Sequence, residues 1–196
     1  MYPLHLKIAI YGSSGSGKST LIELLRKISK NVTVHRKDTT RPPRPVEMAE
    51  GCADLRFVSA EEFEKNRADY DIVYTKYGFL YGIRRDQLVS AFEKKEIHVV
   101  IIRDITALQQ FKYMYPDAIA VYVHADPKMI PANLQKREGV DFSERLRRVE
   151  MEYKEFIENS TLFDNIIVNF WEIDNAVRQI QNILHLHVRK AASNLR

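Results

Sequence analysis

The sequence predicts an α/β fold in which a parallel five-stranded sheet is flanked by helices. Five apolar runs have the length of strands, and most of them are continuous rather than alternating: 6–11, 31–35, 98–103, 118–125 and 165–170. Segments with the period of helices separate these runs. Strands that alternate with helices form parallel sheets, and continuous apolar runs are typical of strands covered on both faces. A glycine-rich loop at 12–20, directly after the first run, agrees with this class.

The first helices are predicted by apolar spacing and by capping patterns. Apolar residues behind the glycine-rich loop fall at i, i+3, i+4 and i+7 of a helix: Leu21, Leu24, Leu25 and Ile28. Ser59 followed by Glu62 is a capping box, so we expect a second helix to begin there. Asp126 and Pro127 have the residue types of an N-cap and a first helical position, and Pro131 predicts a kink or an early end.

Two longer helices are predicted in the second half of the chain. The apolar face of the first is formed by Leu146, Val149, Tyr153 and Phe156. The face of the last is formed by Ala176, Val177, Ile180, Ile183 and Leu184. In the tail 185–196 we expect the end of this helix followed by disorder, with His185 and His187 on different helix faces at the surface.

Length and composition restrict the class of protein. A chain of 196 residues can bury one core and has room for one small inserted subdomain. A hydrophobic fraction of 45% indicates a globular rather than a disordered chain. The apolar runs are too short to cross a membrane, no signal-peptide cleavage site follows the N-terminus, and a single cysteine, Cys52, excludes an internal disulfide. We therefore expect a cytoplasmic protein, and its net charge of +4 does not indicate a nucleic-acid partner.

The glycine-rich loop is the strongest motif. It matches the pattern G-x-x-x-x-G-K-[ST] between a strand and a helix. In such a loop, backbone N–H groups point inward and hold the phosphates of a nucleotide. Lys18 would reach the β- and γ-phosphates, and the Ser19 hydroxyl would ligate Mg²⁺. We assign ATP binding to Gly12, Ser13, Ser14, Gly15, Ser16, Gly17, Lys18, Ser19 and Thr20. No N-K-x-D signature of GTPases follows, so ATP is the expected donor. The flanking strand and helix disfavour the alternative of a chance turn.

A second motif, TTRPPRPVE at 39–47, carries two arginines on a proline-stiffened loop. Arg41 and Arg44 lie three residues apart, so that both guanidinium groups can converge on one phosphate dianion. Taken alone, the pair fits a solvated basic loop equally well.

The order of motifs resembles that of guanylate kinases. The acceptor-binding segment of that family runs T-T-R-x-P-R-x-G-E, then F-V-S-x-x-E-F, then a G-x-x-Y-G turn. This chain has the corresponding residues at 39–47, 57–63 and 78–82. The resemblance continues through 103–111, 115–123, 135–139 and 166–169, and so covers nearly the whole chain.

The resemblance implies a single guanylate kinase-like domain that transfers phosphate from ATP, with Mg²⁺, to the phosphate of a nucleoside monophosphate. It implies a P-loop kinase core of 1–36 and 85–196, an acceptor-binding subdomain at about 37–84 and a lid at about 136–148. GMP or dGMP is the first expectation for the acceptor. The quaternary state is expected to be monomer or homodimer, with no nucleic-acid or membrane partner.

The resemblance also implies roles for single residues. Arg41, Arg44 and Tyr81 match ligands of the acceptor phosphate, while Glu47 and Asp104 match acidic residues on the acceptor side. Arg137 and Arg148 match arginines of the lid, which close on the transferring phosphoryl group. Lys18 and Arg41 are expected to act on the same group. Asn169 matches a residue on the ATP side. For Arg148 the competing interpretation is a solvated helix surface shared with Arg145 and Arg147.

The base-reading positions depart from the family pattern. Where the family has polar side chains that read guanine, ungapped alignment places Lys37, Ile72 and Ile83, and a phosphate-site tyrosine is replaced near Leu55. Asp71 lies one residue from the lost glutamate, so a strand bulge could bring a carboxylate back to the pocket. The altered pocket predicts weak discrimination for guanine.

Four hypotheses remain open at the level of the sequence. The first is a guanylate kinase with an unusual pocket, and the second is a related kinase acting on another nucleotide or on ribose 1,5-bisphosphate. The third is a non-catalytic guanylate kinase-like binding module, which the intact Lys18 and Ser19 disfavour. The fourth, nucleic-acid binding, rests only on the slight positive charge and the basic tail.

Overall fold

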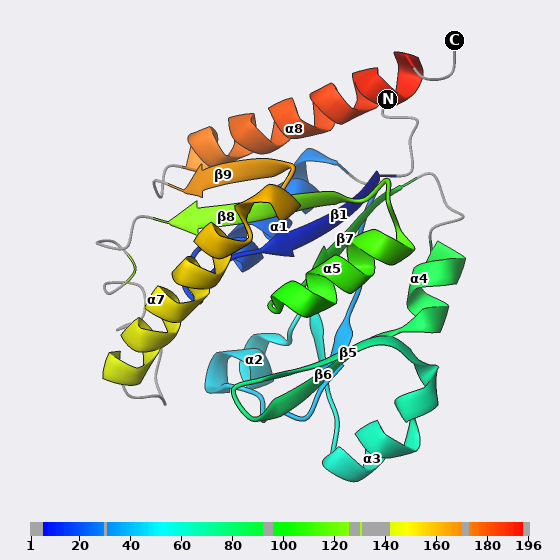
Figure 1. Cartoon of the computed structure of the whole chain (residues 1–196), viewed down its shortest axis with the longest axis vertical. Coiled ribbons are helices and arrows are strands. Elements are labelled where there is room, and N and C mark those ends of the chain that lie inside the picture. Colours follow the sequence, from blue (N-terminus) through cyan, green and yellow to red (C-terminus); the bar gives the residue numbers. More distant parts are fainter. Residues whose placement is uncertain are drawn as a thin grey trace.

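Two sheets organise the chain in the computed structural model, which describes residues 6–29, 31–91, 96–125, 130, 142–169 and 173–193 (Figure 1). The main sheet has five parallel strands in the order β2-β7-β1-β8-β9. Its strands are β1 (Leu6–Tyr11), β2 (Val32–Val34), β7 (Ile97–Ile101), β8 (Ile119–Ala125) and β9 (Asn165–Asn169). All five predicted strands are confirmed, with ends that differ by no more than two residues.

A smaller mixed sheet is built entirely from the segment between Lys37 and Arg84. Its strands are β3 (Lys37–Thr39), β4 (Leu55–Phe57), β5 (Tyr70–Lys76) and β6 (Phe79–Arg84), in the order β4-β3-β6-β5. Here β3 pairs with β4 in parallel, whereas β6 is antiparallel to both β3 and β5.

Helices occupy the segments between strands. They are α1 (Lys18–Ile28), α2 (Pro45–Glu50), α3 (Ala60–Lys65), α4 (Arg85–Ala91), α5 (Ile105–Met114), α7 (Phe142–Glu158) and α8 (Ile173–Ser193), with 3-10 turns at Arg67–Asp69 and Ser160–Leu162. The predicted cap is confirmed, because the Ser59 hydroxyl accepts a hydrogen bond of 3.0 Å from the Glu62 N–H at the start of α3. The predictions for Asp126, Pro127 and Pro131 fall outside the described residues. In the described part of the chain, no helix combines the length and the apolar character that a membrane span requires.

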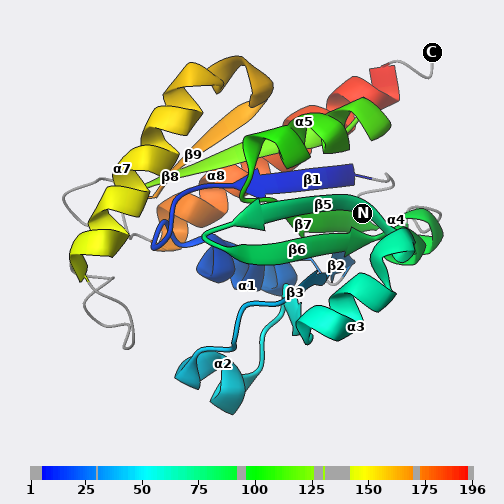
Figure 2. The ribbon, with the colours of Figure 1, turned by 60° about the horizontal axis from the view of Figure 1, so that its bottom comes forward.

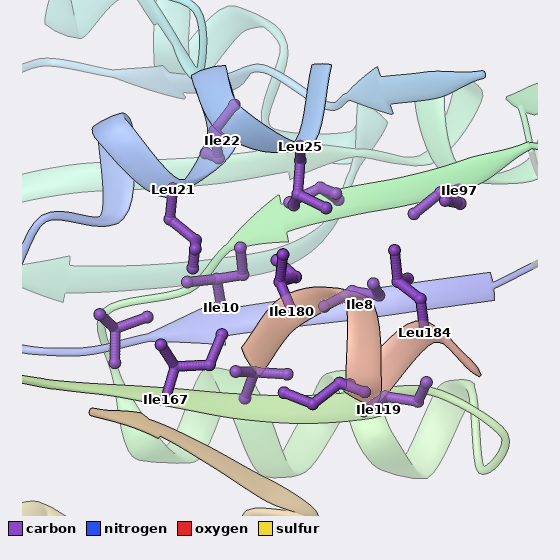
Figure 3. Close-up of a cluster of buried hydrophobic side chains, with 14 of the residues drawn as sticks. Ile8, Ile10, Leu21, Ile22, Leu25, Ile97, Ile119, Ile167, Ile180 and Leu184 are labelled. Atoms are coloured by element: carbon purple, nitrogen blue, oxygen red, sulfur yellow. The ribbon is translucent and has the colours of Figure 1, made fainter. Parts of the chain in front are cut away.

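The hydrophobic core lies on both faces of the main sheet. Ile8 and Ile10 of β1 point to one face, where they pack with residues of α1 and α8 such as Leu25 and Ile180 (Figure 3). Ala9 and Tyr11 point to the other face, among side chains of α5 and the smaller sheet. Figure 2 shows α1 and α5 on opposite faces of β1. The continuous apolar character of β1 thus follows from burial on both sides.

The smaller sheet shares its core with the main sheet. Ile72 and Tyr74 of β5, with Tyr81 and Ile83 of β6, belong to the same buried cluster as Phe111 of α5. Val73 and its cross-strand partner Gly82 alternate with these residues and so lie on the opposite face of the β5–β6 hairpin. This common core holds the smaller sheet against the carboxyl-terminal end of β7, where the candidate site lies.

The buried face of α7 differs from the predicted one. Val149 and Phe156 are buried as expected, but Tyr153 is 38% exposed and the buried residue between them is Glu152, 1% exposed. Positions 149, 152 and 156 follow i, i+3 and i+7, which is one helix face. The prediction that Tyr153 belongs to the buried face is therefore wrong. The inward position is occupied by the charged residue Glu152, which a purely apolar pattern passes over.

The last helix ends at Ser193, within the tail 185–196 as expected, and the expectation of disorder beyond that end falls outside the described residues. His185 is exposed, as predicted, whereas Nε2 of His187 lies 3.1 Å from Nδ2 of Asn165 in β9. This contact ties the extended helix to the edge strand of the main sheet.

Two buried histidines lie side by side at the β2 edge of the main sheet. Nε2 of His35 is 3.2 Å from Nδ1 of His98, and both residues are buried. Burial, reinforced by the neighbouring His98, lowers the pKa of His35 to about 4. In the unfolded chain His35 has the ordinary histidine pKa of about 6.5. Between that pH and about 4, the unfolded chain is protonated at His35 whereas the folded protein keeps the residue uncharged.

We expect the free energy of unfolding to fall by about 3 kcal/mol between pH 7 and pH 4 because of this residue. A group whose pKa is lower in the folded state binds its proton first in the unfolded state, so stability is lost as the pH drops below about 6.5. Urea unfolding at several pH values measures the effect in the parent, in His35→Gln and in the surface control His185→Gln. A pH dependence that is the same in the parent and in His35→Gln contradicts the prediction.

Candidate nucleotide and acceptor site

The P-loop connects β1 to α1, and three of its glycines, Gly12, Gly15 and Gly17, have positive φ angles that other residues rarely adopt. Gly12 has a φ of 157°, and a Cβ there would lie 2.6 Å from the backbone oxygen of Val123. Gly17, the N-cap of α1, has a φ of 90° and supplies no side-chain cap. The first N–H groups of an α-helix have no partner within the helix, and the helix dipole favours negative charge at this end, so the start of α1 suits an anion.

The Lys18 side chain folds back over the loop. Its Nζ donates hydrogen bonds of 2.7 Å to the backbone oxygens of Gly12 and Ser13. The loop is held from β9, because Asn169 Nδ2 donates a hydrogen bond of 2.9 Å to the Ser16 oxygen. Asn169, predicted on the ATP side, thus contacts the P-loop directly.

One cavity of about 90 Å³ joins the P-loop to the smaller sheet. Its walls are formed by Ser14, Gly15, Gly17, Lys18, Ser19 and Thr20 from the loop, by Arg41, Arg44, Glu47, Asp54 and Leu55 from the other side, and by Ile101 and Arg103 at the end of β7. The two motifs selected from the sequence therefore face one another. Such a convergence of cations on one hollow suits two phosphate groups.

Glu47 holds the two arginines of the second motif, Arg41 and Arg44, in place. Nη2 of Arg41 lies 2.8 Å and 2.9 Å from the two carboxylate oxygens of Glu47, which also accepts a hydrogen bond of 2.7 Å from the Arg44 N–H. Nη1 of Arg44 lies 3.8 Å from the same carboxylate. Burial opposes ionisation of Glu47, but its bonds to Arg41 and the Arg44 backbone hold its pKa below the usual range. These contacts limit the directions in which both guanidinium groups can point.

Three predicted acceptor-side residues lie outside the described wall of this cavity. Tyr81 is buried and stacks on Tyr74, with ring centroids 5.1 Å apart. Asp104 caps α5, where its Oδ1 accepts a hydrogen bond of 2.9 Å from the Ala107 N–H. Asp71 forms an ion pair of 2.7 Å with Arg85 at the start of α4.

The predicted lid, at about 136–148, is described only in part. Arg148 lies on α7, where its guanidinium carbon is 4.1 Å from the centroid of the Tyr77 ring and its Nη2 pairs with Glu144. Arg137, the second predicted lid arginine, lies outside the described residues. The contact with Tyr77 brings Arg148 to the turn between β5 and β6.

The positions that the resemblance assigns to base reading are buried. Ile72 and Ile83 are direct partners across β5 and β6, and both are 0% exposed. Lys37 is 1% exposed, and its Nζ donates to the Ile101 oxygen at 2.5 Å and to Asp54 at 3.3 Å. The strand irregularity that Asp71 needs is present between Tyr70 and Ile72. Even so, the carboxylate of Asp71 is directed to Arg85.

Glu152 is the main functional candidate that the sequence did not reveal. Its carboxylate accepts hydrogen bonds from the Ser14 N–H at 2.8 Å, the Tyr77 hydroxyl at 2.9 Å and Arg103 Nη2 at 3.2 Å. Burial opposes its ionisation, yet the charges of Arg103 and Lys18 hold its pKa below the usual range. One carboxylate therefore links the P-loop, the β5–β6 turn and the end of β7. The only sequence signal was an acidic residue on the apolar face of α7.

A P-loop between β1 and α1 of a parallel sheet, facing paired arginines across one cavity, defines a P-loop phosphotransferase of the α/β class. The chain matches the family model described as guanylate kinase over residues 6–187. It belongs to the guanylate kinase family, whose members use ATP.

Individual relatives agree with this assignment. The chain is 30% identical over 185 residues to the guanylate kinase of Gloeobacter violaceus, covering 93% of this chain and 88% of that protein. It is 32% identical over 182 residues to the guanylate kinase of Wolbachia pipientis, covering 91% and 88%. The crystal structure of guanylate kinase from Anaplasma phagocytophilum has a TM-score of 0.69 at 22% identity, over 94% of this chain and 86% of that one. This last likeness shows the fold.

Proposed function

We propose that the protein transfers the γ-phosphoryl group of ATP to the phosphate of a nucleoside monophosphate, with GMP and dGMP as the first acceptors to test. The observation that carries this proposal is the single cavity with Lys18 and Ser19 on one side and Arg41 and Arg44 on the other. A donor phosphate at the P-loop and an acceptor phosphate at the arginines would face each other across it. Family membership supports ATP as the donor.

The residues of the cavity have distinct roles in this proposal. Lys18 and the open N–H groups of α1 bind the phosphates of ATP, and Arg41 and Arg44 orient the acceptor phosphate for in-line attack. Ser19 is exposed at the start of α1 and can hold Mg²⁺, which would neutralise charge on the β- and γ-phosphates. An acceptor phosphate is already ionised at neutral pH, so no general base is required. In this scheme 37–84 is the acceptor-binding subdomain, and 136–148, with Arg137 and Arg148, is the lid.

A second candidate function is transfer to a different phosphorylated acceptor. The observation that favours it is the burial of Ile72, Ile83 and Lys37 at the positions that read guanine in the family. Isoleucine offers no hydrogen-bond acceptor to guanine N–H groups, and a site without paired polar groups discriminates weakly. Asp71, the predicted substitute, is engaged by Arg85.

We expect GMP to be favoured over the best alternative acceptor by less than about a hundredfold in kcat/KM. Shape and apolar contacts alone give discrimination of that order. A coupled assay of ADP release with GMP, dGMP, AMP, CMP, UMP and ribose 1,5-bisphosphate measures the ratio. A much stronger preference for GMP that disappears in Asp71→Ala would instead assign guanine recognition to that carboxylate.

The same assay separates the enzyme from a binding module. ADP release that depends on one of the acceptors supports the kinase. If ATP binds in calorimetry but no acceptor stimulates its turnover, the proposed function fails and a non-catalytic guanylate kinase-like module replaces it.

A further inference from the structure

Glu152 of α7 connects the P-loop to the turn between β5 and β6. Its carboxylate accepts hydrogen bonds from the Ser14 N–H at 2.8 Å and from the Tyr77 hydroxyl at 2.9 Å. Glu152 is buried, with an exposed fraction of 1%. In Figure 2 the turn of the β5–β6 hairpin lies beside α7 and the loop that follows β1. One buried carboxylate therefore holds the P-loop and a turn of the smaller sheet on the same helix.

Glu155, three residues later on the same face of α7, repeats this connection. Its carboxylate accepts a hydrogen bond of 2.5 Å from the hydroxyl of Tyr11, the last residue of β1 before the P-loop. It also accepts one of 2.9 Å from Nζ of Lys76, which precedes the turn. Each member of this α7 carboxylate pair, Glu152 and Glu155, thus fastens the turn to the chain around the P-loop.

Tyr77 has a backbone conformation that tyrosine rarely adopts. Its φ is 53°, and among the described residues it is the one non-glycine residue with a positive φ. It forms a two-residue turn with Gly78, whose φ is 80°. Turns of this kind favour asparagine or glycine at the first position, because a larger side chain is strained there. Such strain persists where other contacts fix the residue, and it is common at functional sites.

The side chain of Tyr77 supplies contacts of that kind. Its hydroxyl binds Glu152, and its ring centroid lies 4.1 Å from the guanidinium carbon of Arg148. Both partners belong to α7, and neither contact is needed to close a two-residue turn. The strained tyrosine therefore serves the connection between the turn and the helix.

The turn is coupled to the arginines of the cavity through the smaller sheet. β6 follows the turn and pairs with β3, where Tyr81 lies opposite Thr39. The Thr39 hydroxyl accepts a hydrogen bond of 3.1 Å from the Arg41 N–H. A shift of the turn away from the P-loop would therefore move Arg41 relative to Lys18. Phosphoryl transfer requires in-line alignment, and a displacement of about 1 Å can lower a rate about a hundredfold.

We propose that Glu152 and Glu155 are positioning residues for phosphoryl transfer, which hold the acceptor-binding side at a fixed distance from the P-loop through Tyr77 and Lys76. Neither glutamate belongs to the described wall of the cavity, so both act on the reaction through the groups that they hold. Loss of their contacts leaves the binding residues of each ligand in place but lets the two phosphates drift out of alignment. The inference rests on the proposed function, because alignment matters only if a donor and an acceptor react in the cavity.

Tyr77→Asn separates a positioning role from a structural one. Asparagine suits the first position of this turn, so relief of backbone strain offsets the lost contacts and the Tm is expected to stay close to the parental value. We expect kcat to fall about ten- to a hundredfold, while the KM of ATP and that of the acceptor each change by less than about threefold. A purely structural role predicts a parental kcat for the folded fraction of this variant.

Tyr77→Phe and Lys76→Met remove the two contacts of the turn one at a time. Phenylalanine keeps the ring beside Arg148 but loses the hydroxyl, and methionine keeps most of the lysine stem but loses the charge. We expect kcat to fall about three- to tenfold in each, and further when the two changes are combined. Tyr113→Phe, at a residue that is 88% exposed, and Lys154→Met, at a side chain that is 78% exposed, are the matched controls and should keep parental kcat.

Hydrogen exchange of backbone amides tests the α7 carboxylate pair without any reaction. In Tyr77→Asn we expect the segments 11–17 and 74–81 to exchange faster than in the parent, while the buried strand 97–101 keeps its rate. A kcat within about twofold of the parental value in both Tyr77→Asn and the combined variant, or unchanged exchange in both segments, overturns the inference. A parent that uses no acceptor overturns the proposed function instead, and exchange then still decides whether these contacts hold the two segments together.

Discussion

Lys18→Ala is expected to lower the rate of phosphoryl transfer by at least about a thousandfold while the protein remains folded. The Lys18 amine lies at the P-loop, with its hydrogen bonds to Gly12 and Ser13. Transfer spreads negative charge over the γ-phosphoryl oxygens, and a missing cation there removes several kcal/mol of transition-state stabilisation. Turnover in the coupled ADP assay at saturating acceptor measures the loss.

Two controls separate chemistry from folding in this experiment. Lys18→Met retains most of the buried stem and is expected to be as inactive as alanine, because both lack the charge. Lys154→Ala removes a lysine from the exposed face of α7 and should keep parental turnover. Circular dichroism and thermal unfolding verify the fold. Parental turnover in Lys18→Ala would refute the enzymatic role of the P-loop.

Arg41→Ala and Arg44→Ala are expected to raise the KM of the acceptor by about ten- to a hundredfold each, with little change in ATP binding. Both side chains line the cavity together with residues of the P-loop. The larger effect is expected for Arg41, since its removal also deprives Glu47 of its closest ion pair. Steady-state kinetics give the acceptor KM, and calorimetric titration with a non-hydrolysable ATP analogue gives the donor affinity.

A conservative variant separates the effect of the charge of Arg41 from the effect of its planar guanidinium group. Arg41→Lys keeps the charge but loses the planar fork, so it should recover only part of the acceptor affinity. Arg67→Ala, in the exposed 3-10 turn that precedes β5, is the control. An equal loss of ATP affinity in Arg41→Ala or Arg44→Ala would show that these residues serve the donor or the fold.

Local patterns in the sequence were sufficient for the main sheet and for the two phosphate-facing motifs. Each strand of that sheet is a short apolar run, and the Ser59 cap depends on residues three apart. The P-loop is likewise read from consecutive residues, because its function needs only glycine dihedrals and one lysine. The expectation that Arg41 and Arg44 face the P-loop rests on the order of motifs in the guanylate kinase family, because no local pattern in the sequence predicts that contact.

The tertiary structure alone decided how polar groups are partnered in the interior. Glu152 lies 138 residues from Ser14, and Lys37 lies 64 residues from the carbonyl of Ile101 that it binds. No local pattern records such pairs, and a charged residue in sequence is ordinarily assigned to the surface. For that reason the apolar pattern of α7 predicts Tyr153, and not Glu152, as an inward residue.

The same limit applies to the candidate acceptor pocket. The sequence by itself determined that Lys37, Ile72 and Ile83 stand at the positions that the resemblance assigns to guanine reading. Only the fold decided where these side chains lie: Ile72 and Ile83 are buried in the core, and Lys37 binds the Ile101 oxygen and Asp54. Burial and hydrogen-bond partners depend on segments that are distant in the sequence, and both exist only when those segments are packed together.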